Sequence, residues 1–409
     1  MTKLVTKKYA VWLYHSKVGS IYQRGDHTWF EFLPEYLARP DRPVLGLKFD
    51  QDLHNRSASL KLPPWFSNLL PEGILREWIA EERNVSVDRE MELLAQVGQD
   101  LPGAVQVAPE GEDLEGRTPA SFSSPRTEDA EQVARWRFSL AGVGLKFSML
   151  RSGDRFTAPA TGLGGDWIVK LPDPQFAGVP ANEFTMMTLA ERVGIDVPET
   201  TLIHRESLVD FPQRIWPGAE DFAYGVKRFD RTETRELIHI EDFAQVRGIY
   251  PVHKYHGNFE TIAALAFRED DESSLSEFVR RLTFFILIGN GDAHLKNWSF
   301  IYRDRFRPAL SPAYDIVATE SYRPPDQPEN LGMKFAGTRR FNKIRLANFG
   351  ALGARIGASS DLEGIADATV SSVLAHWDEA EESLRGFPHL VTHTRESLVS
   401  RAQSLRTNR

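Results

Sequence analysis

The chain has 409 residues, of which 41% are hydrophobic and 11% aromatic, so it is long enough for two or three globular domains or subdomains. Its net charge of −8 argues against a protein that coats nucleic acid unaided, although a local basic patch is compatible with it. The sequence has no cysteine, which excludes disulfides and cysteine-ligated zinc. It shows neither a signal peptide nor an apolar run of about 18 residues, so we expect a cytoplasmic protein without a membrane span.

The N-terminal part predicts a small domain of mixed structure. Apolar and polar residues alternate over Tyr9–Phe32, around Gly19 and the Gly25-Asp26 pair, which indicates a small antiparallel sheet. Helices are predicted over Trp65–Glu82, with an internal boundary near Pro71, and over 88–97, ended by Gly98. The polar, acidic, Ser- and Pro-rich segment that follows lacks apolar periodicity, so we interpret it as a linker.

Beyond the linker, strands are predicted before helices. The expected elements are a strand, Gly-rich turn and strand over 137–151, a strand over 167–171, a helix over 182–193 and a strand over 222–229. Helices are then expected over 240–246, 261–267, 275–288, 367–384 and 396–405. This order predicts an α+β fold of the two-lobed protein-kinase type with an extra small α/β subdomain, divided into residues 1–108 (subdomain), 109–133 (linker), 134–231 (β-rich lobe) and 232–409 (helical lobe).

The strongest signal for chemistry is the polar segment that follows the apolar run 282–288. It places Asp292, His294, Lys296 and Asn297 within six residues. An Asp followed five residues later by an Asn is the spacing of a protein-kinase catalytic loop, in which the Asp takes the proton of the attacking hydroxyl and the Asn holds Mg²⁺. The same Asp would otherwise be a helix cap or turn residue. We expect Lys296 to neutralise charge on the transferring phosphoryl group, and His294 to have a structural role.

Two further segments indicate phosphate binding. Ser139–Lys146 reads S-L-A-G-V-G-L-K, and its two glycines allow the backbone to approach phosphate oxygens. Taken alone, this segment is more simply a tight β-hairpin turn, because the Walker spacing is absent. Lys170 ends an apolar strand, where a kinase has the lysine that grips the phosphates. Glu183 in the next predicted helix would orient this lysine or simply favour the helix dipole.

Asp315, in S-P-A-Y-D-I-V, follows Asn297 by 18 residues. This order suits a second Mg²⁺ ligand better than an ordinary turn Asp, because Mg²⁺ is usually held by one or two carboxylates plus phosphates and waters. His253 and His256 have no third ligand near them in the sequence, so we interpret V-H-K-Y-H as a mobile basic loop and not as a metal site. We interpret residues 241–243 (E-D-F) as an acidic helix start.

Taken in order, these segments resemble the HipA family of bacterial serine/threonine-kinase toxins over nearly the whole chain. In the N-terminal part the resemblance rests on W-F-S-N-L-L-P-E-G and V-G-Q-D-L-P-G-A-V. In the remainder it rests on F-S-L-A-G-V-G-L-K, I-V-K-L-P, N-E-F, V-K-R-F-D-R, H-I-E-D-F-A-Q, I-G-N-G-D-A-H-L-K-N and P-A-Y-D-I. Each motif alone is a modest signal, but seven in the right order are specific.

The resemblance implies that ATP binds between two lobes, that Asp292 is the catalytic base, and that Asn297 and Asp315 hold Mg²⁺. Ser139 matches the serine that the family autophosphorylates, an event that disorders the phosphate loop and silences the kinase. The ATP-binding residues that the resemblance implies are Ala141, Gly142, Val143, Gly144, Leu145, Lys146, Lys170, Lys227, Arg228, Phe229, His294, Leu295, Lys296, Asn297, Tyr314 and Asp315.

The sequence departs from the family pattern at three places. Lys227 stands where the hinge often has Glu, which affects adenine affinity more than activity because hinge contacts run largely through the backbone. The segment Val143-Gly144-Leu145 is less polar than in the best-known members. Ala141 stands where some relatives have a second serine, which leaves Ser139 as the regulatory serine of this type.

The resemblance also implies partners. In the family the substrate is a protein, typically an aminoacyl-tRNA synthetase such as glutamyl-tRNA synthetase, and the usual partner is a HipB-like helix-turn-helix antitoxin. Operator DNA would be contacted mainly through that partner, which agrees with the acidic charge. Two alternatives stay open: a corepressor or scaffold, and a small-molecule kinase. The intact set of Lys170, Asp292, Asn297 and Asp315 argues against the first, and Ser139 argues against the second.

Overall fold

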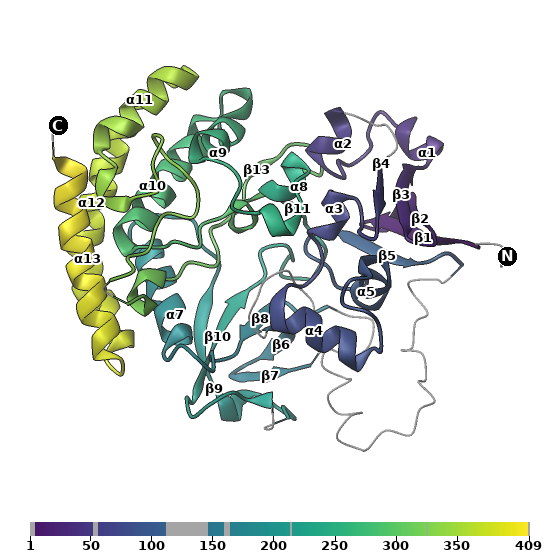
Figure 1. Cartoon of the computed structure of the whole chain (residues 1–409), viewed down its shortest axis with the longest axis horizontal. Coiled ribbons are helices and arrows are strands. Elements are labelled where there is room, and N and C mark those ends of the chain that lie inside the picture. The colour runs from purple at the N-terminus through teal and green to yellow at the C-terminus, as the bar shows by residue number, and fades with distance from the viewer. Residues whose placement is uncertain are drawn as a thin grey trace.

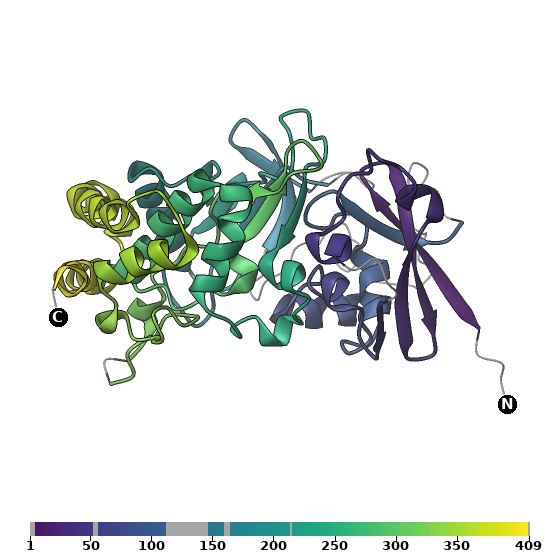
Figure 2. The ribbon, with the colours of Figure 1, turned by 90° about the horizontal axis from the view of Figure 1, so that it is seen from above.

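The structure is a computed structural model that describes residues 5–51, 56–111, 146–158, 164–212, 215–324 and 326–407. The predicted autophosphorylation site Ser139, the phosphate-loop residues Ala141–Leu145 and most of the predicted linker lie outside these ranges. The described chain runs from an N-terminal sheet at one end of the molecule to a group of helices at the other (Figures 1 and 2). None of the helices in these ranges is long and apolar enough to span a membrane.

The N-terminal region is built on a five-stranded antiparallel sheet of order β4-β3-β2-β1-β5. The sheet predicted over Tyr9–Phe32 is confirmed, and two more strands join it. Gly19 lies inside a strand and not at a turn, and a Cβ there would come within 2.4 Å of the Glu31 carbonyl oxygen. The strands are β1 Thr6–Leu13, β2 Ser16–Arg24, β3 His27–Phe32, β4 Arg56–Ser59 and β5 Val105–Pro109.

The boundary predicted near Pro71 within Trp65–Glu82 is confirmed, because the chain forms two helices there, separated by residues 68–72. Asn68 donates its side-chain N–H to the Pro64 carbonyl at 2.8 Å, and Pro71 has no N–H with which to continue a helix. The helix predicted to end at Gly98 is confirmed. The helices of this region are α1 Pro34–Leu37, α2 Leu47–Gln51, α3 Pro64–Ser67, α4 Gly73–Glu82 and α5 Glu90–Val97.

The middle of the chain forms a second five-stranded sheet, of order β7-β6-β8-β10-β9, with a helix packed beside it (Figure 1). The helix predicted over 182–193 begins three residues earlier, since Gly178 adopts a left-handed conformation before it and Pro180 fits its first turn. The strand predicted over 222–229 ends at Lys227. The elements are β6 Lys146–Ser152, β7 Arg155–Thr157, β8 Trp167–Lys170, α7 Val179–Arg192, β9 Thr200–His204 and β10 Phe222–Lys227.

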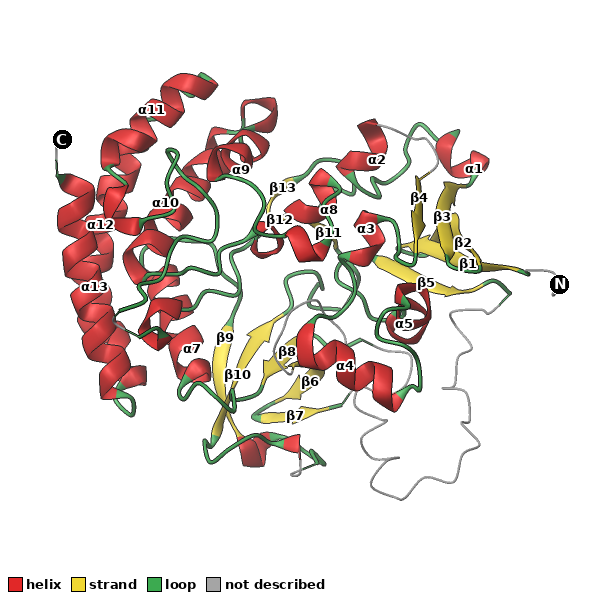
Figure 3. Ribbon diagram, in the orientation of Figure 1, coloured by secondary structure: helices red, strands yellow, loops and turns green. Residues whose placement is uncertain are grey.

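The C-terminal part is mostly helical, as Figure 3 shows, but it holds a small three-stranded sheet of order β11-β12-β13. The helix predicted over Ile240–Val246 is wrong at its start, because Ile240 pairs with Ile301 in this sheet and the helix begins only after the capping residue Asp242. A helix over Leu346–Ile356 was not predicted. The elements are β11 His239–Asp242, α8 Phe243–Arg247, α9 Phe259–Ala266, α10 Glu272–Ile288, β12 Ser299–Tyr302, β13 Ala309–Leu310, α11 Leu346–Ile356, α12 Leu362–Ala380 and α13 Pro388–Arg406.

The buried apolar residues that the structure describes form two cores, and the boundary between these cores does not follow the boundaries of the sheets. One apolar core lies in the C-terminal part, around the fully buried residues Phe278, Phe284 and Trp298. The other core is shared, because residues of the N-terminal region such as Leu94 pack in one cluster with Phe147 of the middle sheet. The N-terminal region therefore docks onto the kinase-like part through buried apolar surface.

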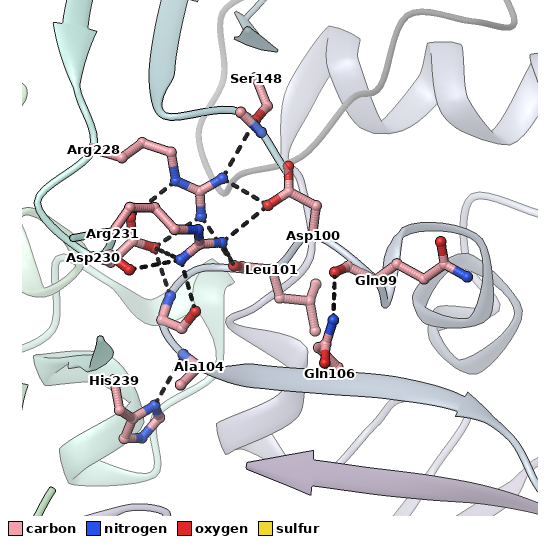
Figure 4. A network of polar contacts seen from close by, with 12 residues as sticks. Gln99, Asp100, Leu101, Ala104, Gln106, Ser148, Arg228, Asp230, Arg231 and His239 are labelled. Atoms are coloured by element: carbon pink, nitrogen blue, oxygen red, sulfur yellow. Dashed lines mark hydrogen bonds and ion pairs between the residues drawn. The ribbon is translucent and has the colours of Figure 1, made fainter. Parts of the chain in front are cut away.

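A buried polar cluster, which we call the hinge network, strengthens this docking (Figure 4). Arg228 pairs with Asp100 at 2.7 Å and with Asp230 at 2.8 Å, and Arg231 pairs with the same two carboxylates at 3.1 Å and 3.0 Å. Arg228 also donates to the Leu101 carbonyl at 3.1 Å. The segment after β10 is therefore held to the N-terminal region by two arginines and two aspartates that carry balanced charge.

Candidate active site

The predicted catalytic loop follows the buried residues 282–288 at the end of helix α10. Helix α10 ends at Gly289, whose φ of +70° is left-handed and where a Cβ would come within 2.5 Å of the Arg401 guanidinium. The loop after it is fixed by its own hydrogen bonds. The Asp292 N–H donates to the Asn290 side chain at 3.0 Å, and the Asn297 side chain donates to the Asp292 carbonyl at 2.9 Å. A rigid base thus holds Asp292 and Asn297 in one short loop.

A second set of charged groups lies across the cleft from this loop. The Lys170 ammonium lies 2.5 Å from a Glu183 carboxylate oxygen and 2.6 Å from one of Asp315. The predicted partnership of Lys170 with Glu183 is confirmed as a contact. Asp315 has a φ of +61°, a sparsely populated conformation for a residue other than glycine, and such strain is concentrated at functional sites.

Burial and neighbouring charges perturb the ionisation of this set. Burial raises the pKa of Glu183 to about 7, although Lys170 acts in the opposite direction. Burial also opposes ionisation of Asp315, but Lys170 and Lys146 lower the pKa of Asp315 below its ordinary value. Burial and then the charge of Lys170 lower the pKa of Lys146 to about 8. Two carboxylates and a lysine with strongly shifted pKa values in one cleft are typical of a functional site.

These groups line a cleft of about 270 Å³. Its lining combines charged side chains with aromatic ones, among them the Phe229 and Tyr314 rings, whose centroids are 5.5 Å apart. The residues that line the cleft are Asn68, Leu69, Glu72, Pro102, Lys146, Ile168, Lys170, Glu183, Val226, Lys227, Arg228, Phe229, Asp230, Ile240, Asp242, Gln245, Lys254, Asp292, His294, Lys296, Asn297, Ser299, Tyr314 and Asp315.

The N-terminal region supplies a wall of this cleft that the sequence did not predict. Glu72 pairs with Lys254 at 2.9 Å and with Lys296 at 2.8 Å, and Lys296 also donates to the Asn68 carbonyl at 2.9 Å. Burial opposes ionisation of Glu72, but Lys296 and Lys254 lower its pKa to about 2. Lys296 lines the cleft, where its ammonium is bound to Glu72 and Asn68, and the expectation that it neutralises charge on a phosphoryl group stays a prediction.

The hinge residues have different surroundings. Lys227 pairs with Glu233 at 2.6 Å, and the Arg228 guanidinium belongs to the hinge network. Phe229 alone of the three contributes a ring beside Tyr314. Leu295, predicted to bind ATP, is fully buried in the C-terminal core and does not line the cleft.

The basic segment V-H-K-Y-H packs against the catalytic loop, which contradicts its interpretation as a mobile loop. The Tyr255 hydroxyl donates to the Asp292 carboxylate, and the Tyr255 ring meets the His294 ring edge-on at 5.0 Å between centroids. The expectation that His253 and His256 are not a metal pair stays a prediction. Their rings stack at 4.7 Å, and the described part of the chain holds no group of three His, Cys, Asp or Glu suited to a metal ion.

Asp292 and His294 are perturbed in opposite directions. Burial in the cleft raises the pKa of Asp292 to about 6, and the hydrogen bond from the Tyr255 hydroxyl opposes this shift. Even so, 48% of the Asp292 side chain is accessible. Burial, with a smaller effect of Lys254, lowers the pKa of His294 to about 3. His294 is therefore neutral at pH 7, which agrees with the structural role expected for it.

Comparison with known proteins places these features in a family. Residues 9–108 match the model of the HipA N-terminal domain, and residues 138–377 match that of the HipA-like C-terminal domain. A putative kinase of Sinorhizobium fredii is 41% identical over 387 residues, which cover 91% of each chain. The serine/threonine-protein kinase toxin HipA of Shewanella oneidensis is 26% identical over 301 residues, which cover 66% of each chain.

A solved structure supports the fold. HipA of Shewanella oneidensis MR-1, in a complex with HipB and operator DNA, matches with a TM-score of 0.74 at 21% identity, over 97% of each chain. The predicted α+β fold of the two-lobed kinase type, with an extra N-terminal subdomain, is confirmed. The match of both domain models and the 41% identical relative lead to the same conclusion. The chain belongs to the HipA family of kinases.

Proposed function

We propose that this chain is an ATP- and Mg²⁺-dependent protein serine/threonine kinase that acts as the toxin of a HipA/HipB-type pair. The observation that carries the proposal is the arrangement of Lys170 between Glu183 and Asp315, in the same cleft as Asp292 and Asn297. This is the set of parts that phosphoryl transfer from a nucleotide requires, since catalysis there is mostly positioning and neutralisation of charge.

Each part has a role in the proposed reaction. Lys170 grips the phosphates of ATP, and the part of the cleft around Phe229 and Tyr314 accepts the base. Asp292 takes the proton of a serine hydroxyl while the serine oxygen forms its bond to the γ-phosphorus and the bond from that phosphorus to the β–γ bridging oxygen breaks, releasing ADP.

The carboxylate of Asp315, 38% accessible, and the side-chain oxygen of Asn297 offer the hard oxygen ligands that Mg²⁺ prefers. When bound there with the phosphates, the ion would neutralise charge that develops on the transferred group.

The proposal extends to substrate, regulation and partner. We infer that the acceptor is a serine of an aminoacyl-tRNA synthetase and that autophosphorylation at Ser139 silences the kinase. A HipB-like antitoxin is the expected partner, and operator DNA would be bound through it. The solved relative in a complex with HipB and operator DNA supports the partner. We also propose that the protein is cytoplasmic. The proposal further includes the domain boundaries after residues 108 and 231.

The test is incubation of the purified protein with Mg²⁺ and γ-labelled ATP, followed by mass-spectrometric mapping of the label. We expect phosphate on Ser139 in the wild type. Asp292→Ala should bind ATP almost as well but lose most of the transfer. An Asp292→Ala protein that transfers phosphate at the wild-type rate would contradict the assignment of the base. Absence of both label and ATP binding in the wild type would favour a scaffold that represses together with its antitoxin.

A further inference from the structure

The side chain of the proposed base is held from one side. The backbone of Asp292 is fixed within its loop, but within the described part of the chain Tyr255 is the one side chain that donates a hydrogen bond to the carboxylate. Nε2 of His294 lies 3.9 Å from the same carboxylate oxygen, which is beyond hydrogen-bond distance. The rotamer of Asp292 therefore depends on Tyr255.

Tyr255 is itself firmly placed. Its carbonyl oxygen accepts a hydrogen bond from Arg339 at 3.0 Å, and its ring packs edge-on against His294. The preceding residue, Lys254, pairs with Glu72 and accepts a hydrogen bond on its carbonyl oxygen from the Leu295 N–H at 3.1 Å. A tyrosine held at its backbone, its ring and its neighbour can fix a group that it touches.

We propose that Tyr255 is a positioning residue for Asp292. Its hydroxyl fixes one carboxylate oxygen, and the other oxygen stays open to the cleft to take the proton of the acceptor hydroxyl. The 48% of the Asp292 side chain that remains accessible leaves room for that acceptor. The role rests on the proposed kinase function, since it is a role toward the base of that reaction.

The test compares Tyr255→Phe with Tyr250→Phe, a variant on the same segment whose ring lies under the Lys61 ammonium, 5.1 Å away, and does not touch the catalytic loop. The readout is the initial rate of incorporation of label from γ-labelled ATP into the protein itself, at several ATP concentrations. Circular dichroism and the unfolding midpoint confirm that both variants are folded.

We expect Tyr255→Phe to lower the maximum rate by about tenfold to a hundredfold, which is the range for the loss of one hydrogen bond to a charged group. The half-saturating concentration of ATP should stay unchanged. Tyr250→Phe should match the wild type in both respects. A purely structural disturbance of the cleft by Tyr255→Phe would also raise the half-saturating concentration of ATP.

Three results overturn the role of Tyr255 in an active enzyme. An unchanged maximum rate shows that the hydroxyl does not act on the base. A loss of rate together with a higher half-saturating concentration of ATP shows a general disturbance of the cleft, and a faster rate in Tyr255→Phe shows that the hydroxyl instead blocks the place of the acceptor. A wild-type protein that transfers no phosphate overturns the proposed function, and the role of Tyr255 with it.

Discussion

Two clusters of charged side chains lie near strand β10, and solvent reaches them to different extents. In the hinge network the side chains of Arg228, Arg231, Asp100 and Asp230 are between 0% and 6% exposed. Every carboxylate there faces an arginine, and the network adds donors and acceptors from the backbone at Leu101 and Gly103. Such a closed network of charges binds one part of the protein to another.

The cleft cluster is arranged in the opposite way. Lys170 is 22% exposed and Asp315 is 38% exposed, although the Glu183 to which Lys170 is bound is only 4% exposed. The buried end fixes the geometry, and the accessible end is open to a ligand, which in the proposed function is the phosphates and a cation. The same pairing of lysine or arginine with carboxylates thus holds the structure together where it is sealed and leaves a group for chemistry where one end is open.

The largest effect is expected when the closed network is broken. Asp230→Asn removes the charge that faces both Arg228 and Arg231, and it leaves their buried charges undercompensated. We expect the free energy of unfolding to fall by about 3–5 kcal/mol, measured by urea unfolding at pH 7. The matched control is Asp378→Asn, which breaks an exposed pair with Arg395 and should leave the urea midpoint nearly unchanged. Equal midpoints for the two variants would show that the hinge network contributes nothing to the docking.

A smaller effect, on activity, is expected at the sealed end of the cleft cluster. Glu183→Gln keeps an acceptor for Lys170 but removes the charge that orients this lysine. We therefore expect kcat/KM for ATP to fall by about tenfold to a hundredfold, which is the range seen when a partner that orients a binding group is lost. The measurement is the initial rate of label incorporation against ATP concentration. Glu191→Gln, on the exposed face of the same helix, is the control. Equal rates in the two variants would show that Glu183 only stabilises its helix.

These two clusters also show how far the sequence could be read. The order Lys170, Asp292, Asn297 and Asp315 predicted groups of one cleft, because local motifs of a kinase carry their own spacing. The role of Arg228 in docking was not predictable from V-K-R-F-D-R. Its partner Asp100 lies 128 residues earlier in the chain, and nothing in the local pattern shows that the two meet.

The secondary structure shows the same limit. Helix α10 was predicted well because its apolar residues and the glycine that ends it are local signals. The helix predicted over 240–246 wrongly includes part of strand β11. Ile240 pairs with Ile301, a residue far along the chain, and such pairing overrides local propensity. Glu72 could not be assigned to the cleft for the same reason, since its motif N-L-L-P-E-G gives no sign of the lysines that it meets.

Glu72 combines both kinds of contact: it belongs to the N-terminal region, and its carboxylate lies in the cleft, paired with Lys254 and Lys296. Its pKa of about 2 in the folded protein lies below the ordinary value of 4.5, so its stabilisation is fully present above about pH 4.5 and is lost as the pH falls toward 2. We expect Glu72→Gln to lower the free energy of unfolding by about 1–2 kcal/mol at pH 7.

Urea unfolding of wild type and Glu72→Gln at pH 7, 5 and 3.5 would measure this contribution. The difference between the two proteins should be nearly the same at pH 7 and pH 5 and should shrink at pH 3.5, because Glu72 then takes up a proton in the unfolded chain while it stays ionised beside Lys254 and Lys296 in the folded protein. Glu77→Gln, on the exposed face of α4, should show no such dependence. A difference that stays constant down to pH 3.5 would mean that Glu72 acts by packing alone, and that the N-terminal region touches the cleft without an electrostatic link to the catalytic loop.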